Sequence, residues 1–269
     1  MVTQQEKADR FKKLHQQAGA FVIPNPWDAG SARILEGLGF QALATTSSGF
    51  ANTLGRLDGQ VTLDEKLEHC RSICTATSVP VNADLENGFA DDPETAARTM
   101  VRAAVAGVAG GAIEDYSGEA IYDFELAVER VQAAAEATHA LETPFMLTAR
   151  AENLLRGRDD LDDTVRRLRA FEAAGADVLY APGLKTLDEV RTVTSAVSKP
   201  VNVLAVMVKG ATVEELASAG AKRLSVGGAL ASASLASLLQ AGREMLETGS
   251  FGWLSDRASA SDLERLLGT

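Results

Sequence analysis

Short apolar segments alternate with amphipathic helical segments along almost the whole chain, and this alternation limits the folds that the chain can adopt. The apolar segments have the length of buried strands, and each is followed by a segment with helical periodicity. We expect eight strands, at residues 20–24, 42–46, 79–84, 111–114, 144–149, 177–181, 200–204 and 223–226. Eight such units in 269 residues predict one (β/α)8 TIM-type barrel domain over residues 1–269. A doubly wound open sheet is the alternative.

Helix starts carry their own signals. Thr62, Thr186 and Thr212 each stand three residues before a glutamate, which is the spacing of the capping box. Asp92 precedes a proline and predicts another start. After the last strand, residues 255–266 predict an additional C-terminal helix. Its apolar face needs a surface to pack on, and a neighbouring subunit is one candidate; the face consists of Leu263, Leu266 and Leu267.

Composition excludes several classes of function. The net charge of −11 makes nucleic acid an improbable partner, because phosphate binding needs clustered Lys and Arg. The N-terminus has no apolar signal-peptide core, and no apolar run reaches the ~20 residues of a membrane helix. Cys70 and Cys74 share a helical face with leucines and are interpreted as core thiols. We therefore expect a cytoplasmic protein without nucleic-acid or membrane partners.

Acidic residues gather where the third and fourth strands end, which is the active-site face of a barrel. Asp84 and Glu86 are alternate residues and would point to the same side of an extended strand, and Glu114 ends the next strand. Neighbouring carboxylates repel unless a cation intervenes, and Mg²⁺ commonly takes one or two carboxylates and several waters. The residues therefore predict a Mg²⁺ site. Solvated loop acids are the alternative interpretation.

Other polar residues end neighbouring strands. Arg150 would bind a substrate carboxylate in bidentate fashion. A turn at residues 46–48 would offer Thr46, Ser47 and Ser48 to a developing oxyanion. Asn202 completes the expected substrate-binding set.

Other chemistries lack their residues. His15, His69 and His139 all fall on helical segments, away from the strand ends, which argues against a zinc site or a Ser-His-Asp triad. A Schiff-base aldolase needs a lysine in the barrel interior. Lys209 and Lys222 are not at positions expected to face that interior, so this class of enzyme is disfavoured. A metal-dependent lyase fits better.

The chain resembles the isocitrate lyase/phosphoenolpyruvate mutase superfamily over nearly its whole length. The matching segments are TTSSG (45–49), LGRLDG (54–59), NADLENGF (82–89), GAIED (111–115), LTAR (147–150) and PVNVLA (200–205). The resemblance implies a barrel that binds Mg²⁺, with Mn²⁺ as the alternative, and a 2-oxo acid. It also implies a dimer or tetramer in which the last barrel helix is exchanged between subunits.

The same resemblance implies roles for individual residues. Asp84 would touch the metal directly, and the acids Asp58, Glu86 and Glu114 would hold its water shell. The residues at 46–48 and Arg150 would bind the oxo acid.

This sequence departs from the superfamily pattern in one loop. Isocitrate and methylisocitrate lyases carry a Lys-Lys/Arg-Cys-Gly-His motif after the fourth strand. Residues 116–123, YSGEAIYD, contain no Cys, His or Lys, and the loop of the phosphonopyruvate branch is missing as well. The second acid of the DxE pair is Glu86 where Asp is usual. The sequence therefore indicates the metal more firmly than the reaction.

The leading hypothesis is a Mg²⁺-dependent carbon–carbon lyase or decarboxylase that acts on a small, oxaloacetate-like 2-oxo dicarboxylic acid through an enolate. The expected catalytic residues are Arg150, Glu114 and Tyr116, with Tyr116 or a water as the general acid. Mutase or hydrolase chemistry on the C–P bond of phosphonopyruvate is the second hypothesis. The third is a protein that binds a 2-oxo acid without turnover.

Overall fold

The computed structural model describes residues 2–268, so the two end residues of the expected domain lie outside the described range. Eight parallel strands form one sheet, in the order β1-β8-β7-β6-β5-β4-β3-β2. The strands are β1 (Phe21–Ile23), β2 (Leu43–Ala44), β3 (Val81–Asp84), β4 (Gly110–Glu114), β5 (Met146–Arg150), β6 (Val178–Tyr180), β7 (Val201–Leu204) and β8 (Arg223–Ser225). Each of them falls within or beside an expected strand.

The two ends of this sheet meet, which makes it a nearly closed barrel. The backbone N–H of Ala44 donates to the carbonyl of Pro24 over 3.0 Å. The Asn25 amide donates to the Thr45 carbonyl over 3.1 Å and connects the same two strand ends. The (β/α)8 barrel is therefore confirmed, and the open-sheet alternative is wrong.

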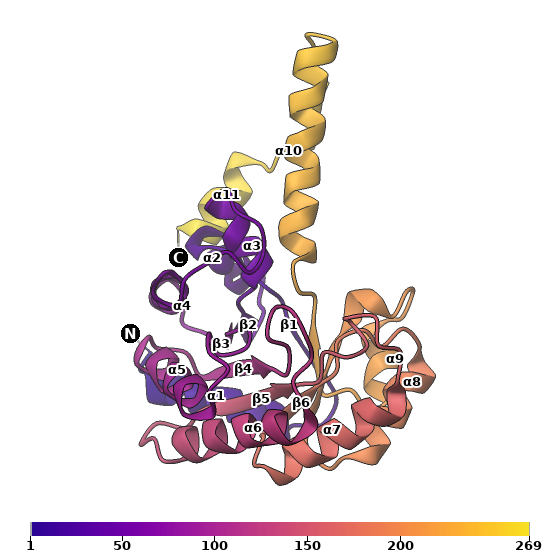
Figure 1. Cartoon of the computed structure of the whole chain (residues 1–269). Helices are drawn as coiled ribbons and strands as arrows, with labels where there is room; N and C mark the ends of the chain where they lie inside the picture. Colours follow the sequence, from indigo (N-terminus) through magenta and orange to yellow (C-terminus); the bar gives the residue numbers. More distant parts are fainter. Residues whose placement is uncertain (1, 269) are drawn as a thin grey trace.

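Helices surround the strands (Figure 1). They are α1 (Gln4–Gln16), α2 (Ala29–Gly37), α3 (Ser47–Thr53), α4 (Leu63–Ala76), α5 (Pro93–Val105), α6 (Phe124–His139), α7 (Leu161–Ala173), α8 (Leu187–Ala196), α9 (Val213–Ser218), α10 (Ala229–Glu247) and α11 (Ala260–Leu267), with short 3₁₀ turns at Ala205–Met207 and Gly252–Asp256. The three expected capping boxes are confirmed, and Asp92 caps α5 as expected.

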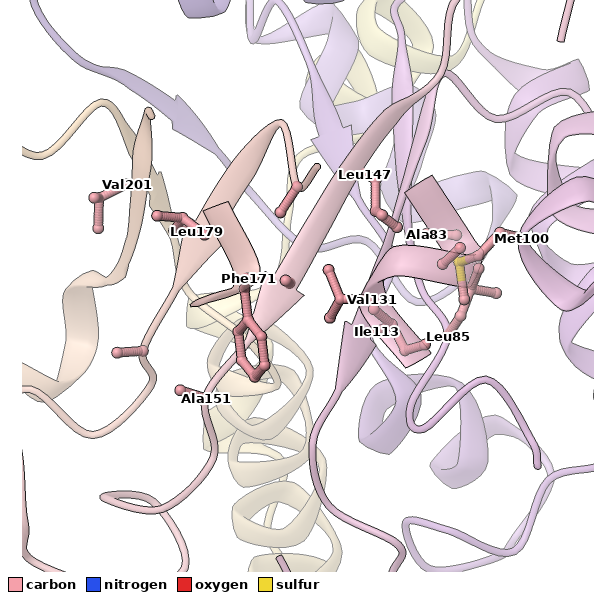
Figure 2. Close-up of a cluster of buried hydrophobic side chains, with 14 of the residues drawn as sticks. Ala83, Leu85, Met100, Ile113, Val131, Leu147, Ala151, Phe171, Leu179 and Val201 are labelled. Atoms are coloured by element: carbon pink, nitrogen blue, oxygen red, sulfur yellow. The ribbon is translucent and has the colours of Figure 1, made fainter. Parts of the chain in front are cut away.

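Successive side chains along each strand point alternately to the helices outside the barrel and to the barrel interior. The outward side chains pack against the surrounding helices: Leu147, Leu179 and Phe171 of α7 belong to one buried cluster, and Figure 2 shows Ala83 near Met100 of α5. The residues directly before and after these outward-facing residues point into the barrel. The hydrophobic core therefore lies between sheet and helices, and the barrel interior is free to carry polar side chains.

The C-terminal helices depart from the regular barrel. α10 follows β8 but projects away from the strands (Figure 1). Several of its leucines are exposed, with Leu238 67%, Leu239 57% and Leu246 89% accessible. α11 returns to the barrel and packs on α2 of the same chain, where Leu266 is buried against Gly37. The expected C-terminal helix is therefore present, and part of its apolar face is covered within the chain.

Two further expectations concern the cysteines and membrane-spanning helices. Cys70 and Cys74 are buried, and burial raises the pKa of their thiols to about 11 and about 12, so both are core thiols. Within residues 2–268, none of the helices combines the length and the apolar character needed to cross a membrane.

Candidate active site

A cavity of about 220 Å³ opens at the C-terminal ends of the strands. It gathers most of the site residues expected from the sequence, although they come from segments far apart in the chain. Those that line it are Thr46, Ser47, Ser48, Asp58, Asp84, Glu114, Arg150 and Asn202. Glu86 and Tyr116 line a second cavity, which shares Ser47, Asp58 and Glu114 with the first.

Arg150 lines the first cavity and contacts three carboxylates. Its Nη1 is 2.9 Å from Glu114 Oε1 and 3.1 Å from Asp84 Oδ1. Its Nη2 is 2.7 Å from Oε1 of Glu152, which is fully buried. The guanidinium thus already binds three acids from β3, β4 and the segment after β5, and an incoming carboxylate must share it with them.

This ion-pair network sets the charge states of its members. Burial alone would lower the pKa of Arg150, but Glu114, Glu152 and Asp84 raise it well above its usual value. Burial alone would raise the pKa of Asp84, but Arg150, Lys66 and the Ser47 N–H together lower it. Asp84 is therefore an ionised carboxylate inside the protein, which is the state that a metal ligand needs.

Glu86 reaches the site by a route that differs from the expected one. β3 ends at Asp84, and Glu86 lies in a turn with a left-handed φ of 50°, so the expectation that both acids share one face of an extended strand is wrong. The turn is held by the Glu114 N–H, which donates to the Glu86 carbonyl over 2.8 Å. Burial raises the pKa of the Glu86 carboxyl to about 7, and its Oε1 is buried without a partner among the described residues.

Residues 46–48 also differ from expectation. They are the start of helix α3 and not an isolated turn, because the Thr46 side chain caps the helix by accepting from the Gly49 N–H. The N–H of Ser47, the first residue of α3, donates to Asp84 Oδ2 over 3.1 Å. The helix start therefore holds the central carboxylate, and the Ser48 hydroxyl faces the cavity within 3.2 Å of Thr46 Oγ1.

The acids at the barrel mouth form a candidate cation site. Among residues 2–268, no three Asp, Glu, His or Cys side chains are grouped closely enough to hold an ion by themselves. Mg²⁺ commonly needs only one or two protein carboxylates and keeps several waters. Ionised Asp84 and the unpartnered Oε1 of Glu86 fit that mode of binding. Burial raises the pKa of Glu114 beside them, against the lowering effect of Arg150.

Tyr116 lies at the edge of this arrangement. Its hydroxyl donates to the Gly118 carbonyl over 2.7 Å, and its ring stacks under the guanidinium of Arg156 at 3.9 Å. Arg156 also lies 3.6 Å from Glu114 Oε2 and lines both cavities. The loop at 116–123 therefore approaches the site through an arginine that the sequence did not single out.

Two more cavity residues had no role assigned from the sequence. Tyr180 of β6 lies with its ring 5.0 Å from the Arg150 guanidinium, and burial raises its pKa to about 12. Arg223 of β8 points into the barrel and is 3% exposed. A charged residue inside a short apolar strand was the available signal for Arg223, whereas Arg156 had none because its loop shows no periodicity.

The three histidines lie on helices and not at the strand ends, as expected from the sequence. His15, His69 and His139 sit on α1, α4 and α6. Burial lowers the pKa of His15 and His69 to about 3, so both rings are neutral packing residues.

Comparisons with known proteins agree with this architecture. A crystal structure of a candidate lyase/mutase from Burkholderia cenocepacia J2315 is 48% identical, superposes with a TM-score of 0.95, and is matched over 99% of this chain and 97% of that chain. The crystal structure of 2,3-dimethylmalate lyase is 27% identical, with a TM-score of 0.85, over 100% of this chain and 96% of that one.

Sequence relatives include an uncharacterised protein of Mycobacterium tuberculosis, 31% identical over 87% of each chain. The 2-methylisocitrate lyase of Escherichia coli is 31% identical over 65% of this chain and 61% of its own length. A family model described as phosphoenolpyruvate phosphomutase matches residues 11–246. The chain therefore belongs to the phosphoenolpyruvate phosphomutase family, within the isocitrate lyase/phosphoenolpyruvate mutase superfamily.

Proposed function

We propose that the chain is a Mg²⁺-dependent lyase that cleaves a carbon–carbon bond of, or decarboxylates, a small 2-oxo dicarboxylic acid. The observation that carries the proposal is the ionised Asp84, held between Arg150 and the Ser47 N–H at the barrel mouth and flanked by further acids. The similarity to 2,3-dimethylmalate lyase and to 2-methylisocitrate lyase supports the same reaction class.

The metal fits the residues present. Asp84 would hold Mg²⁺ or Mn²⁺ directly, and Asp58, Glu86 and Glu114 would hold its waters. The ion, when bound, supplies a Lewis acid for the oxo and carboxylate oxygens of the substrate. All four acids line the two adjoining cavities.

The chain's own groups perform the remaining work. The Ser47 and Ser48 hydroxyls face the cavity and would donate to the oxygen on which negative charge develops as the enolate forms. Arg150 would orient the carboxylate next to the oxo group, sharing its donors with Glu114. Tyr116 is the proposed proton donor; its hydroxyl must first leave the Gly118 carbonyl.

Cleavage of a C–P bond in phosphonopyruvate is the second candidate. It is favoured by the matching family model and by a candidate phosphonomutase of Burkholderia cenocepacia J2315, which is 32% identical with a TM-score of 0.82 over 92% of this chain and 100% of that one. Binding of a 2-oxo acid without turnover is the third, because the loop at 116–123 lacks Cys, His and Lys.

One experiment separates these candidates. Calorimetric titration of the Mg²⁺-loaded protein with oxaloacetate, 2-oxoglutarate and phosphonopyruvate is run beside turnover assays for pyruvate, carbon dioxide and phosphate. Carbon–carbon cleavage that Asp84→Ala abolishes supports the lyase, whereas release of phosphate or formation of phosphoenolpyruvate supports the second candidate. Binding without any product supports the third.

The active unit is proposed to be a homo-oligomer, a dimer or a tetramer. α10 projects from the barrel with exposed leucines, and a second copy of the chain would cover them (Figure 1). Exchange of this helix between subunits would place it on the partner's barrel.

A further inference from the structure

Arg223 places a buried guanidinium inside the barrel with only neutral partners. Its Nε donates to Asn202 Oδ1 over 2.8 Å, and its Nη2 donates to Thr148 Oγ1 over 3.1 Å. Its Nη1 is buried and has no partner among residues 2–268. The pKa of Arg223 is lowered to about 9, mainly by burial; Tyr180 opposes this shift and Arg150 adds to it. A buried cation without a counter-charge is unfavourable, so an anion bound there would be stabilised.

Arg223 is joined to the barrel mouth by a row of inward-facing side chains. Consecutive strands pair in register as Glu114 with Arg150, Arg150 with Tyr180, Tyr180 with Asn202, and Asn202 with Arg223. Because barrel strands tilt by about 36°, a row perpendicular to the strands slopes into the interior. Arg223 donates to Thr148, which stands two residues before Arg150 on β5. Thr148 lies roughly 6.6 Å deeper in the barrel than Arg150, measured along that strand, and the guanidinium of Arg223 lies beside it.

The cavity is open along this row. Arg150 and Arg223 line the same cavity, together with Tyr180 and Asn202. The lining also includes the short side chains of Ala44 and Ala112, beside the larger Ile23 and Asn82. A small ligand at the mouth can therefore extend down to Arg223.

The two arginines differ in what they can still bind. The donors of Arg150 face Asp84, Glu114 and Glu152, whereas the Nη1 of Arg223 faces no acceptor of the described chain. The surface of this Nη1 is covered by neighbouring protein atoms, and a carboxylate that reaches it would gain a charge-assisted hydrogen bond without displacing a hydrogen-bond partner.

We propose that Arg223, oriented by Asn202 and Thr148, binds the second anionic group of the substrate and so selects 2-oxo acids that are charged at both ends. The inference rests on the proposed function, which places the 2-oxo acid end at the mouth beside Asp84. A monocarboxylic 2-oxo acid leaves the buried guanidinium unpaired, and sites with unpaired polar groups discriminate strongly against such ligands.

Calorimetric titration of the Mg²⁺-loaded wild type and of Arg223→Met tests this subsite, with oxaloacetate, 2-oxoglutarate and pyruvate as ligands. We expect the dicarboxylic acids to lose about 10- to 100-fold in affinity in the variant, the loss of a hydrogen bond to a charged group. Pyruvate, which does not reach Arg223, should bind both proteins equally. An equal loss for all three ligands, or no loss for the dicarboxylic acids, overturns the proposal.

Asn202→Leu is the second variant, and it carries the test if Arg223→Met does not fold. It removes the oxygen that orients Nε while leaving the guanidinium in place, so the same ligand pattern should appear with a smaller loss. Thermal unfolding of each variant reports its folding. If the wild type binds and converts none of the acids, the proposed function fails; if it converts them and neither variant discriminates between ligands, only the subsite fails.

Discussion

Asp84 and Arg150 form a largely buried ion pair across the barrel mouth, with 3.1 Å between Oδ1 and Nη1 and side chains that are 18% and 11% exposed. The pair joins the expected metal ligand to the expected substrate-binding cation. Binding of a metal and binding of a 2-oxo acid must therefore rearrange one shared network. A substitution that weakens one ligand should also change the affinity for the other.

Asp84→Asn keeps the shape of the side chain and removes its charge. We expect Mg²⁺ affinity to fall by at least roughly 10- to 100-fold, which is the loss seen for groups that support a metal site. Isothermal titration with MgCl₂ measures it. Asp64→Asn is the matched control, since Asp64 is a carboxylate paired with Arg102 on the surface. Unchanged Mg²⁺ binding in Asp84→Asn would contradict the metal assignment.

Arg150→Met leaves three acids without their shared cation. Breaking a buried pair by removing one partner costs about 3–5 kcal/mol in the free energy of unfolding. Urea denaturation without metal measures this loss, and added Mg²⁺ should recover part of it. Arg191→Met removes an exposed arginine paired with Asp188 and should change stability by less than about 1 kcal/mol. Similar losses in the two variants would show that the network does not stabilise the fold.

His15 should make stability depend on pH. Its pKa is lowered by burial from 6.5 to about 3, so its contribution is fully present above pH 6.5 and is lost as pH falls toward 3. Relative to His15→Phe, the wild type should lose about 2 kcal/mol between pH 7.5 and pH 5. Urea denaturation of both proteins at each pH measures the difference. The comparison cancels the opposite trend of Asp115, whose pKa is raised to about 6 by burial.

A constant stability difference between wild type and His15→Phe across this pH range would disprove the prediction. Phenylalanine suits the site because His15 packs edge-to-face between Phe11 and Phe21.

Gly49 lets α3 approach its neighbours. A Cβ at this position would lie 2.6 Å from Thr46 Cγ2 and 3.0 Å from Trp27 Cβ, so Gly49→Ala should displace the helix start that holds Asp84. We expect a loss of about 1–3 kcal/mol in stability and weaker Mg²⁺ binding. Gly242→Ala, on α10 with no atom within 4 Å of the added carbon, should be neutral or stabilising. Thermal unfolding that places both variants at the same midpoint would refute the crowding.

Leu239→Glu tests the proposed oligomer. A charge on the exposed face of α10 should disfavour its burial against a second chain, so the mass from light scattering should fall toward the 28.3 kDa of one chain. Val105→Glu introduces the same charge at an apolar residue on α5 that is 79% exposed, and it should leave the mass unchanged. A wild type that is already monomeric would rule out the proposed assembly.

The sequence alone was sufficient for the barrel and for most residues of its mouth. Strands and helix caps are local, since Val81 and its neighbours specify a strand and Thr62 with Glu65 specifies a helix start within a few residues. Once eight such units are known, the strand ends must meet at one face, which brings Asp84, Glu114 and Arg150 together.

Only the tertiary structure decided how those residues are paired. The left-handed turn at Glu86, the N–H of Ser47 on Asp84, and the contact of Arg156 with Tyr116 depend on distances between segments that are far apart in sequence. The contrast between Arg150 and Arg223 arises in the same way. Both are inward-facing arginines on barrel strands, and the register of β5 to β8 surrounds one with acids and leaves the other among neutral groups.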